Sequence, residues 1–206
     1  MERYLNDSGD SVYDESGEWV GGSYRRGDMV SKDGSGLAAM NINQAKISHG
    51  MPRGFLSVWG GSPGVGKTRL AISVCKGLNR YANKCLYFNG EASNEDFRLW
   101  LGNDISDDYF QFITNDLISM VDVLRFIRQE KPAVVVIDSL QMLVESHNGR
   151  NAINSILNQF KSIKNDMEYG CPHIILISQL TKGGEVYGSN LIRHLVDFVG
   201  KVRHIK

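Results

Sequence analysis

Eight consecutive residues, Gly61 to Thr68, have the types and spacing of a loop that binds the phosphates of a nucleotide. They read Gly-Ser-Pro-Gly-Val-Gly-Lys-Thr and match G-x-x-x-x-G-K-[ST] at every fixed position. Glycines let main-chain N–H groups turn toward an anion, because no side chain blocks its approach. The lysine can reach the β- and γ-phosphates, and the threonine hydroxyl is a ligand for Mg²⁺. The predicted nucleotide-binding residues are Gly61, Ser62, Pro63, Gly64, Val65, Gly66, Lys67, Thr68 and Arg69.

Two acidic residues follow apolar runs and are candidates for the metal and for the chemistry. Asp138 ends the run AVVVI, where the P-loop fold places the acid associated with Mg²⁺. Ser139 follows it, so the Asp-Glu pair of many ring ATPases is missing, which argues against the AAA+ class and favours the RecA-like class. We therefore predict that Glu91 deprotonates the attacking water, since it follows the run KCLYF, which we expect beside the P-loop strand. The alternative is that Glu91 caps the next helix.

From residue 37 onward, short apolar runs alternate with helical patterns, which is typical of a parallel sheet covered by helices. The P-loop motif lies between such a run and such a pattern, so a chance match in an unrelated loop is disfavoured. The β-branched run before Asp138 predicts a central strand that is buried on both faces. Ser93, with Asp96 three residues later, predicts a helix start. The expected strands are 55–59, 84–88, 109–113, 133–137, 173–178 and 198–205, and the expected helices are 68–82, 93–101, 116–129 and 151–167.

The composition changes near residue 36. Residues 1–36 hold eight acidic and four basic residues, many glycines and serines, and no apolar period. We interpret this segment as a flexible N-terminal arm. Its aromatic residues point to a protein partner or a neighbouring subunit, and packing on its own domain is the alternative that stays open. They are Tyr4, Tyr13, Trp19 and Tyr24.

The overall composition bounds the class of protein. The chain has 206 residues, 42% of them hydrophobic, and 23 basic against 23 acidic side chains. This predicts one folded domain, with no bulk charge from which nucleic-acid binding can be argued. Three cysteines stand far apart, which excludes a disulfide scaffold or a zinc ribbon and suits a reducing compartment. No apolar run approaches the ~20 residues that span a bilayer, and no signal peptide is visible, so we predict a cytoplasmic protein without a membrane segment.

The order and spacing of these motifs resemble the RadA/Sms ATPases, which are RecA-like recombination proteins of bacteria. The resemblance covers residues 37–206 and extends to DnaB-type helicases and KaiC-type ATPases. It implies an α/β RecA-like P-loop NTPase fold, in which a mostly parallel central sheet is flanked by helices. It also implies that ATP and Mg²⁺ bind at interfaces between subunits of a hexameric ring or a filament. The matching elements are Gly60–Thr68, Leu86–Ser93, Val136–Gln141, Thr181–Gly184, Gly188 and His194–Asp197.

The resemblance assigns further roles to residues in two loops. Gln179 is expected to sense the γ-phosphate, and Lys182 to act in trans on the nucleotide of a neighbouring subunit. The loops after Asp138 and after Gln179 correspond to DNA-facing loops of the class. This makes Arg150, Lys182 and Tyr187 the candidates for contact with single-stranded or branched DNA, through phosphates or base stacking. The alternative for Arg150 and Lys182 is that they are solvated loop charges.

Two functions therefore compete. The first is an ATP-dependent DNA-processing ATPase, acting in recombination, repair or unwinding, with Glu91, Lys67, Gln179 and Lys182 as its catalytic residues. The second is a nucleotide-gated assembly or signalling ATPase of KaiC type that does not bind DNA. Zero net charge and the missing four-cysteine zinc ribbon favour the second. The K-N-R-F-G motif and the Lon-protease-like domain of RadA are also missing from this sequence, which fits either a core that kept only ATP-driven switching or a minimal helicase or recombinase. The matched loop positions favour the first.

Overall fold

The computed structural model describes residues 51–79, 83–102, 110–114, 119–146, 151–181, 184, 186, 192 and 194–203, and short strands within the first 50 residues. The chain divides into two units, residues 1–53 and residues 54–206. In the first unit the strands form antiparallel pairs, β1 with β2, β3 with β6 and β4 with β5. The flexible arm predicted for residues 1–36 falls largely outside the described residues, so it stays a prediction. The strands of this unit are β1 (Tyr4–Leu5), β2 (Ser11–Tyr13), β3 (Gly36–Leu37), β4 (Met40–Ile42), β5 (Ala45–Ile47) and β6 (Met51–Pro52).

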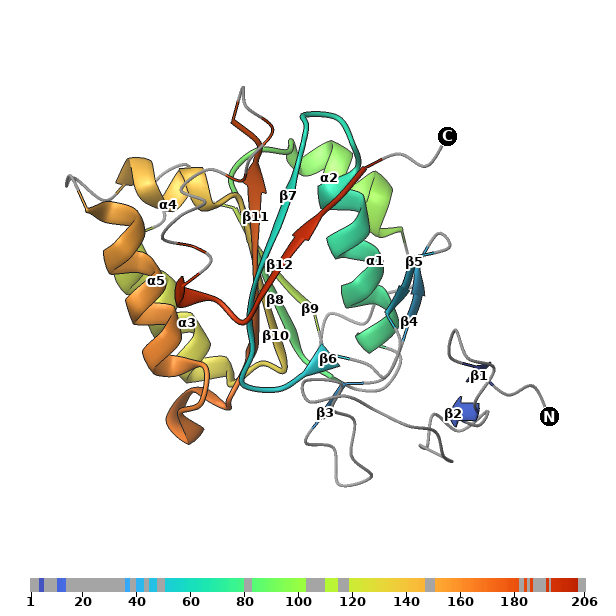
Figure 1. Cartoon of the computed structure of the whole chain (residues 1–206), viewed down its shortest axis with the longest axis horizontal. Coiled ribbons are helices and arrows are strands. Elements are labelled where there is room, and N and C mark those ends of the chain that lie inside the picture. The colour runs from blue at the N-terminus through green and yellow to red at the C-terminus, as the bar shows by residue number, and fades with distance from the viewer. Residues whose placement is uncertain are drawn as a thin grey trace. The chain divides into compact units, whose positions relative to one another are not determined.

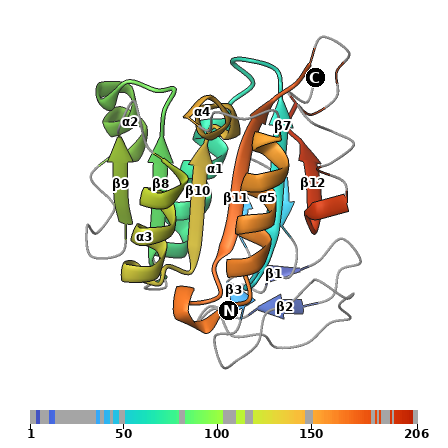
Figure 2. The ribbon, with the colours of Figure 1, turned by 90° about the vertical axis from the view of Figure 1, so that its left-hand side faces the viewer.

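The second unit is built on a six-stranded sheet in which every pair of neighbouring strands is parallel. The order across the sheet is β12-β7-β11-β10-β8-β9, as Figure 2 shows. All six expected strands are present, although the last ends at Lys201 and not at residue 205, and the parallel sheet flanked by helices is confirmed. The strands are β7 (Leu56–Gly61), β8 (Cys85–Asn89), β9 (Phe110–Thr114), β10 (Val134–Asp138), β11 (His173–Gln179) and β12 (Phe198–Lys201).

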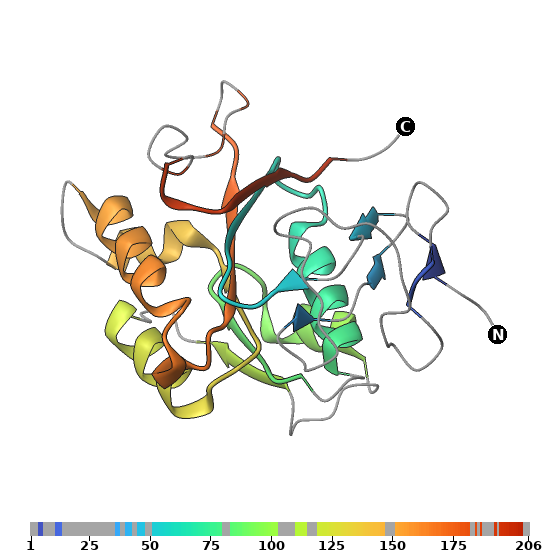
Figure 3. The same ribbon diagram turned by 60° about the horizontal axis from the view of Figure 1, so that its bottom comes forward.

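Helices cover both faces of this sheet. Helices α1 and α2 lie on one face, and α3, α4 and α5 on the other (Figure 1), an arrangement that the turned view repeats (Figure 3). Helix α4 was not predicted, because its seven residues directly after Asp138 are too few for a clear helical period. The described helices include none that is long and apolar enough to cross a membrane. The helices are α1 (Lys67–Asn79), α2 (Asn94–Leu101), α3 (Met120–Glu130), α4 (Leu140–Ser146), α5 (Ala152–Ile163) and the 3₁₀ turn η1 (Met167–Tyr169).

Local sequence explains the central strand and the helix starts. The β10 residues Val134–Ile137 have no exposed surface, which confirms a strand buried on both faces. Ser93 is the N-cap of α2, and its hydroxyl accepts a hydrogen bond from the Asp96 N–H at 3.0 Å, as predicted. At α3, Ser119 and Asp122 form a capping box. The helix therefore begins at Met120, and the expected start at residue 116 is wrong.

Asp197 ties the edge strand β12 to the start of β7. Its carboxylate accepts a hydrogen bond from the Leu56 N–H at 2.8 Å, and its own N–H donates to the Leu56 carbonyl at 2.8 Å. The same carboxylate forms an ion pair with Lys164, which follows α5 and whose side chain is only 11% exposed. Asp197 belongs to the RadA-like His194-Leu195-Val196-Asp197 element, and the structure gives it this positioning role.

Changing Asp197 to Asn should destabilise the fold. The amide can still accept from Leu56, but the nearly buried Lys164 ammonium loses its counter-charge. We expect the free energy of unfolding, measured in urea, to fall by roughly 2 kcal/mol. The control is Glu168→Gln, because Glu168 pairs with Arg128 and both side chains are at least half exposed. Equal effects of the two changes would contradict the anchoring role of Asp197.

Candidate nucleotide site

The P-loop connects the end of β7 to the start of α1. Gly64 and Gly66 have positive φ angles of +73° and +93°, and a Cβ added at either would meet no heavy atom within 4 Å. These two glycines are needed for their backbone conformation. Gly61 is needed for space instead, because its Cβ would lie 2.7 Å from the Val65 Cγ1. The turn so formed opens onto the N-terminus of α1, whose free N–H groups and partial positive charge favour an anion.

Lys67 places a positive charge at the floor of this loop. Its side chain is buried, and its ammonium donates hydrogen bonds to the carbonyls of Gly61 and Ser62, each at 3.0 Å. These carbonyls belong to the loop itself, so the ammonium is held where the loop turns. A phosphate entering the loop would therefore meet the main-chain donors and the Lys67 charge together.

The Asp138 carboxylate lies beside the first turn of α1, fully buried. Its Oδ2 accepts hydrogen bonds from the hydroxyls of Thr68 and Tyr87, each at 2.7 Å, while its buried Oδ1 has no hydrogen-bond partner among the described residues. Burial raises the pKa of Asp138, and the Glu91 charge adds to this rise, whereas the two hydroxyls and Lys67 lower it. A carboxylate with a free oxygen beside a threonine hydroxyl is the hard oxygen donor set that suits Mg²⁺.

Glu91 and Gln179 meet at the same edge of the sheet. Glu91 follows β8, and its Oε1 accepts a hydrogen bond from the Gln179 Nε2 at 3.4 Å. Gln179 ends β11, where it pairs in register with Gly61 on β7. The structure thus brings the predicted base and the predicted sensor together at the carboxyl ends of the strands, where the P-loop begins.

Our expectation that the Glu91 strand lies beside the P-loop strand is wrong. Strands β11 and β10 stand between β7 and β8. Sequence does not fix the lateral order of strands, because the apolar runs of a buried parallel sheet look alike. Glu91 contacts Gln179, which ends the strand that pairs with the P-loop strand.

The loop that carries Glu91 is shaped by its own polar groups. The buried Asn89 side chain donates to the Ala92 carbonyl at 2.7 Å and accepts from the Ala92 N–H at 3.0 Å. The Gly90 N–H donates to the Asp138 carbonyl at 2.7 Å. Because the N-cap of α2 is Ser93, the structure does not support the alternative that Glu91 caps this helix.

Helix α4 contacts the carboxyl ends of β11 and β8, which sequence reasoning missed. The Gln141 Nε2 donates to the Ser178 hydroxyl at 3.2 Å, one residue before Gln179. Met142 packs so tightly over Gly90 that a Cβ there would lie 2.2 Å from its sulfur. Gln141 stands in the Ile-Asp-Ser-Leu-Gln element that we matched to RadA, and this match was the available signal for its role.

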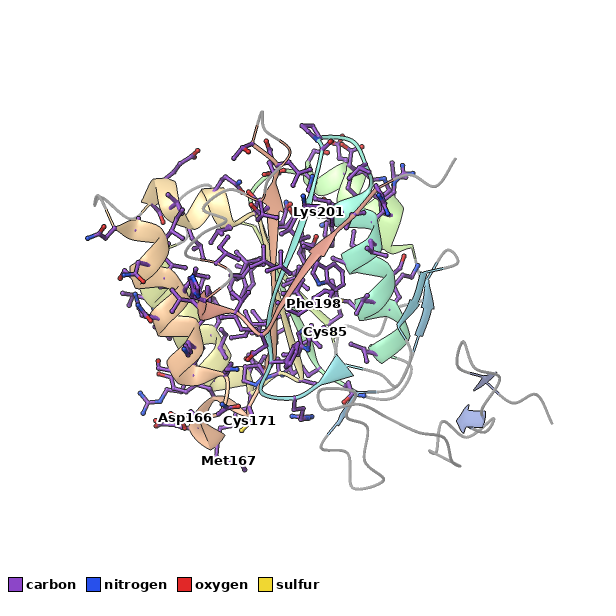
Figure 4. The ribbon with its side chains drawn as sticks, viewed as in Figure 1. Cys85, Asp166, Met167, Cys171, Phe198 and Lys201 are labelled. Carbon is purple, nitrogen blue, oxygen red and sulfur yellow. The ribbon has the colours of Figure 1, made fainter. Side chains whose placement is uncertain are left out.

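A cavity of about 430 Å³ borders the P-loop on the side of β12. Sequence reasoning missed its lining residues outside the P-loop, since only the tertiary structure places β12 beside β7. Figure 4 labels Lys201 at the end of this strand. The cavity is lined by Ser62, Pro63, Gly64, Val65, Leu180, Lys201, Val202 and Arg203.

The remaining predicted residues are distributed as follows. Arg69 lies on α1 with its guanidinium 5.3 Å from the centre of the Trp100 ring on α2, a cation–π contact. Its predicted part in nucleotide binding stays a prediction. Arg150, Lys182 and Tyr187 lie outside the described residues, so their roles stay predictions as well.

Solved structures share this architecture and so show the fold. The chain superimposes on one solved ATPase domain with a TM-score of 0.63 and 17% identity, over 74% of this chain and 70% of that one. For the flagellar accessory protein FlaH of Methanocaldococcus jannaschii, the TM-score is 0.62 and the identity 16%, over 80% of each chain. For a KaiC-like protein of Pyrococcus horikoshii, they are 0.57 and 18%, over 73% and 72%. The fold is that of a RecA-like P-loop ATPase, as the resemblance implied.

The family follows from residues 36–185, which match the AAA_25 model, described as an AAA domain. This match spans well over half of the sequence, so the chain belongs to that family. We had argued against the AAA+ class because no Glu follows Asp138, yet the description of this family is an AAA domain. The RecA-like fold, which the same argument favoured, is confirmed.

Curated relatives confirm the resemblance to RadA. The DNA repair protein RadA of Campylobacter jejuni is 28% identical over 157 residues, which are 74% of this chain and 34% of that protein. RadA of Bacillus subtilis is 27% identical with the same coverage, and RadA of Mycobacterium tuberculosis is 23% identical over 87% of this chain and 41% of that protein. The chain thus spans about a third of the length of the first two relatives.

Changing Gly66 to Ala should weaken nucleotide binding. A φ of +93° costs an L-residue about 1–2 kcal/mol, and relaxation of this strain would turn the loop N–H groups away from the phosphates. We expect the dissociation constant for ATP, measured by fluorescence titration, to rise at least tenfold. Gly102→Ala is the control, because Gly102 has a similar φ of +67° at the end of α2. An equal loss of affinity in the control would show that general strain, and not loop geometry, is responsible.

Proposed function

We propose that the chain binds ATP with Mg²⁺ at the P-loop, hydrolyses ATP at an interface between subunits, and couples hydrolysis to the binding of single-stranded or branched DNA. The observation that carries the ATPase part is the contact of Thr68 with the buried, half-satisfied Asp138 beneath a complete P-loop. The DNA part is supported by the relatives, which are named as DNA repair proteins.

The predicted residues around the P-loop have the following roles in this proposal. Lys67 and the loop N–H groups hold the β- and γ-phosphates, and Thr68 and Asp138 hold Mg²⁺, which supplies neutralisation of phosphate charge. Glu91 takes a proton from the water that attacks the γ-phosphorus, as the bond to the bridging oxygen of ADP breaks. Gln179 contacts Glu91 and ends the strand beside the P-loop, a position suited to reporting the γ-phosphate.

The cavity beside the loop is the proposed place for the nucleoside. It begins at Ser62–Val65, so a nucleotide whose phosphates lie in the loop can extend into it. Its volume of about 430 Å³ falls within the range of small-ligand sites. Lys201 and Arg203 add positive charge at its rim. The lysine is already held by a hydrogen bond of 2.9 Å to the Gly184 carbonyl.

Changing Glu91 to Gln should separate binding from hydrolysis. The amide cannot accept the proton of the attacking water, so we expect turnover to fall by about 100-fold or more with ATP affinity retained. Release of phosphate and binding of a fluorescent ATP analogue are the two measurements. Glu95→Gln, an exposed residue in the first turn of α2, is the matched control, and Lys67→Ala the blank. An unchanged rate in Glu91→Gln would reassign the base, and normal hydrolysis by Lys67→Ala would refute the site.

Single-stranded DNA should raise the ATPase rate in a manner that fades with salt, because phosphate contacts release counterions. We expect Arg150→Ala and Lys182→Ala to lose this stimulation. Arg128→Ala, which removes an exposed arginine of α3, should keep it. The rates are compared with and without DNA at low and moderate salt. Turnover that is indifferent to DNA would support the KaiC-type switch, which the zero net charge favours.

A further inference from the structure

We propose that Tyr87 is a positioning residue, which holds the Asp138 carboxylate in the orientation that binds the metal. This inference rests on the proposed function, since it concerns Mg²⁺ at the same site. The Tyr87 hydroxyl donates to Asp138 Oδ2 at 2.7 Å, and the Thr68 hydroxyl donates to the same oxygen at the same distance. Both donors act on one oxygen, which leaves Oδ1 for the metal or its bound water.

The position of Tyr87 on the sheet explains the contact. Asp138 on β10 pairs in register with Asn89 on β8, and Tyr87 lies two residues earlier on β8. Side chains two residues apart on a strand share a face, so Tyr87 is a diagonal neighbour of Asp138. Thr68 approaches the same carboxylate from α1. The carboxylate therefore lies between donors from two separate elements.

The tyrosine ring itself is rigidly held. Tyr87 has no exposed surface, and its ring packs edge-on against Phe97 of α2 at a centroid distance of 4.8 Å. Phe110 and Phe112 of β9 flank the ring at 6.4 and 6.2 Å. A ring enclosed in this way has little freedom at either side-chain torsion, so its hydroxyl is fixed in space.

The two donors to Asp138 differ in what else they must do. The Thr68 oxygen is a proposed metal ligand, so its geometry changes with the metal. Tyr87 has no such duty, and its hydrogen bond can persist in the empty and in the loaded site. Hydrogen bonds from outer groups to a ligating carboxylate typically change metal affinity by 10–100-fold. Tyr87 lies within the stretch Leu86–Ser93 that matches RadA, but that match assigned it no role, so sequence reasoning did not select it.

Changing Tyr87 to Phe tests the inference, because it removes the hydroxyl and keeps the ring. We measure binding of a fluorescent ATP analogue to the full chain as Mg²⁺ is titrated, and again in EDTA. The Mg²⁺ concentration at half-saturation should rise about tenfold, whereas binding in EDTA should not change. The matched control is Tyr169→Phe, because Tyr169 lies on η1, just before β11 begins. It is therefore at the amino ends of the strands, away from the site at their carboxyl ends. This control should leave both values unchanged.

A double-mutant cycle with Asp138→Asn shows whether Tyr87 acts through the carboxylate. If it does, Tyr87→Phe should add no further Mg²⁺ requirement in the Asp138→Asn background. An equal loss of affinity with Mg²⁺ and in EDTA, or an unchanged Mg²⁺ requirement, would overturn the inference and leave the proposed function intact. Undiminished binding of the analogue by Lys67→Ala would instead refute the proposed function, so the two failures are distinguishable.

Discussion

The buried carboxylate of Asp138 is the constraint on which the arrangement of the site depends. A charge without exposed surface is costly unless hydrogen bonds compensate it. The compensation comes from Thr68 on α1 and Tyr87 on β8, so the P-loop helix and the Glu91 strand are both tied to β10. The other oxygen of the carboxylate, Oδ1, has no hydrogen-bond partner among the described residues, so it is free to bind a cation.

The parallel sheet determines which residues lie close together at the site. Because all six strands run in the same direction, their carboxyl ends meet at one edge, where Gly61, Asp138 and Gln179 end their strands. Strand β11 stands between the P-loop strand and β10, and its last residue, Gln179, contacts Glu91. Helix α4 adds a second connection, from Gln141 to Ser178 and from Met142 to Gly90. The site is therefore formed by residues at the ends of several strands, which contact one another, and not by the P-loop alone.

The edge strand β12, which lies beside the P-loop strand, is held by a different interaction. Asp197 anchors β12 to β7 near the start of both strands, through Leu56 and the nearly buried Lys164. The far end of β12 then lies next to the P-loop and forms one wall of the cavity with Lys201 and Arg203. An ion pair at one end of the strands thus helps to position the wall of the cavity at the other.

Local spacing and periodicity were enough to predict the P-loop, the six strands, most of the helices and the positions of Asp138, Glu91 and Gln179 at strand ends. The strand order, the Tyr87 contact and the cavity could not be predicted, because they depend on which distant segments pack together, and helix α4 was too short to show a helical period. We wrongly expected the Glu91 strand beside the P-loop strand, because the sequence of a buried apolar strand does not show which strands it pairs with. A hydroxyl such as that of Tyr87 acquires its role from a carboxylate 51 positions away in the chain, and no local pattern encodes that distance.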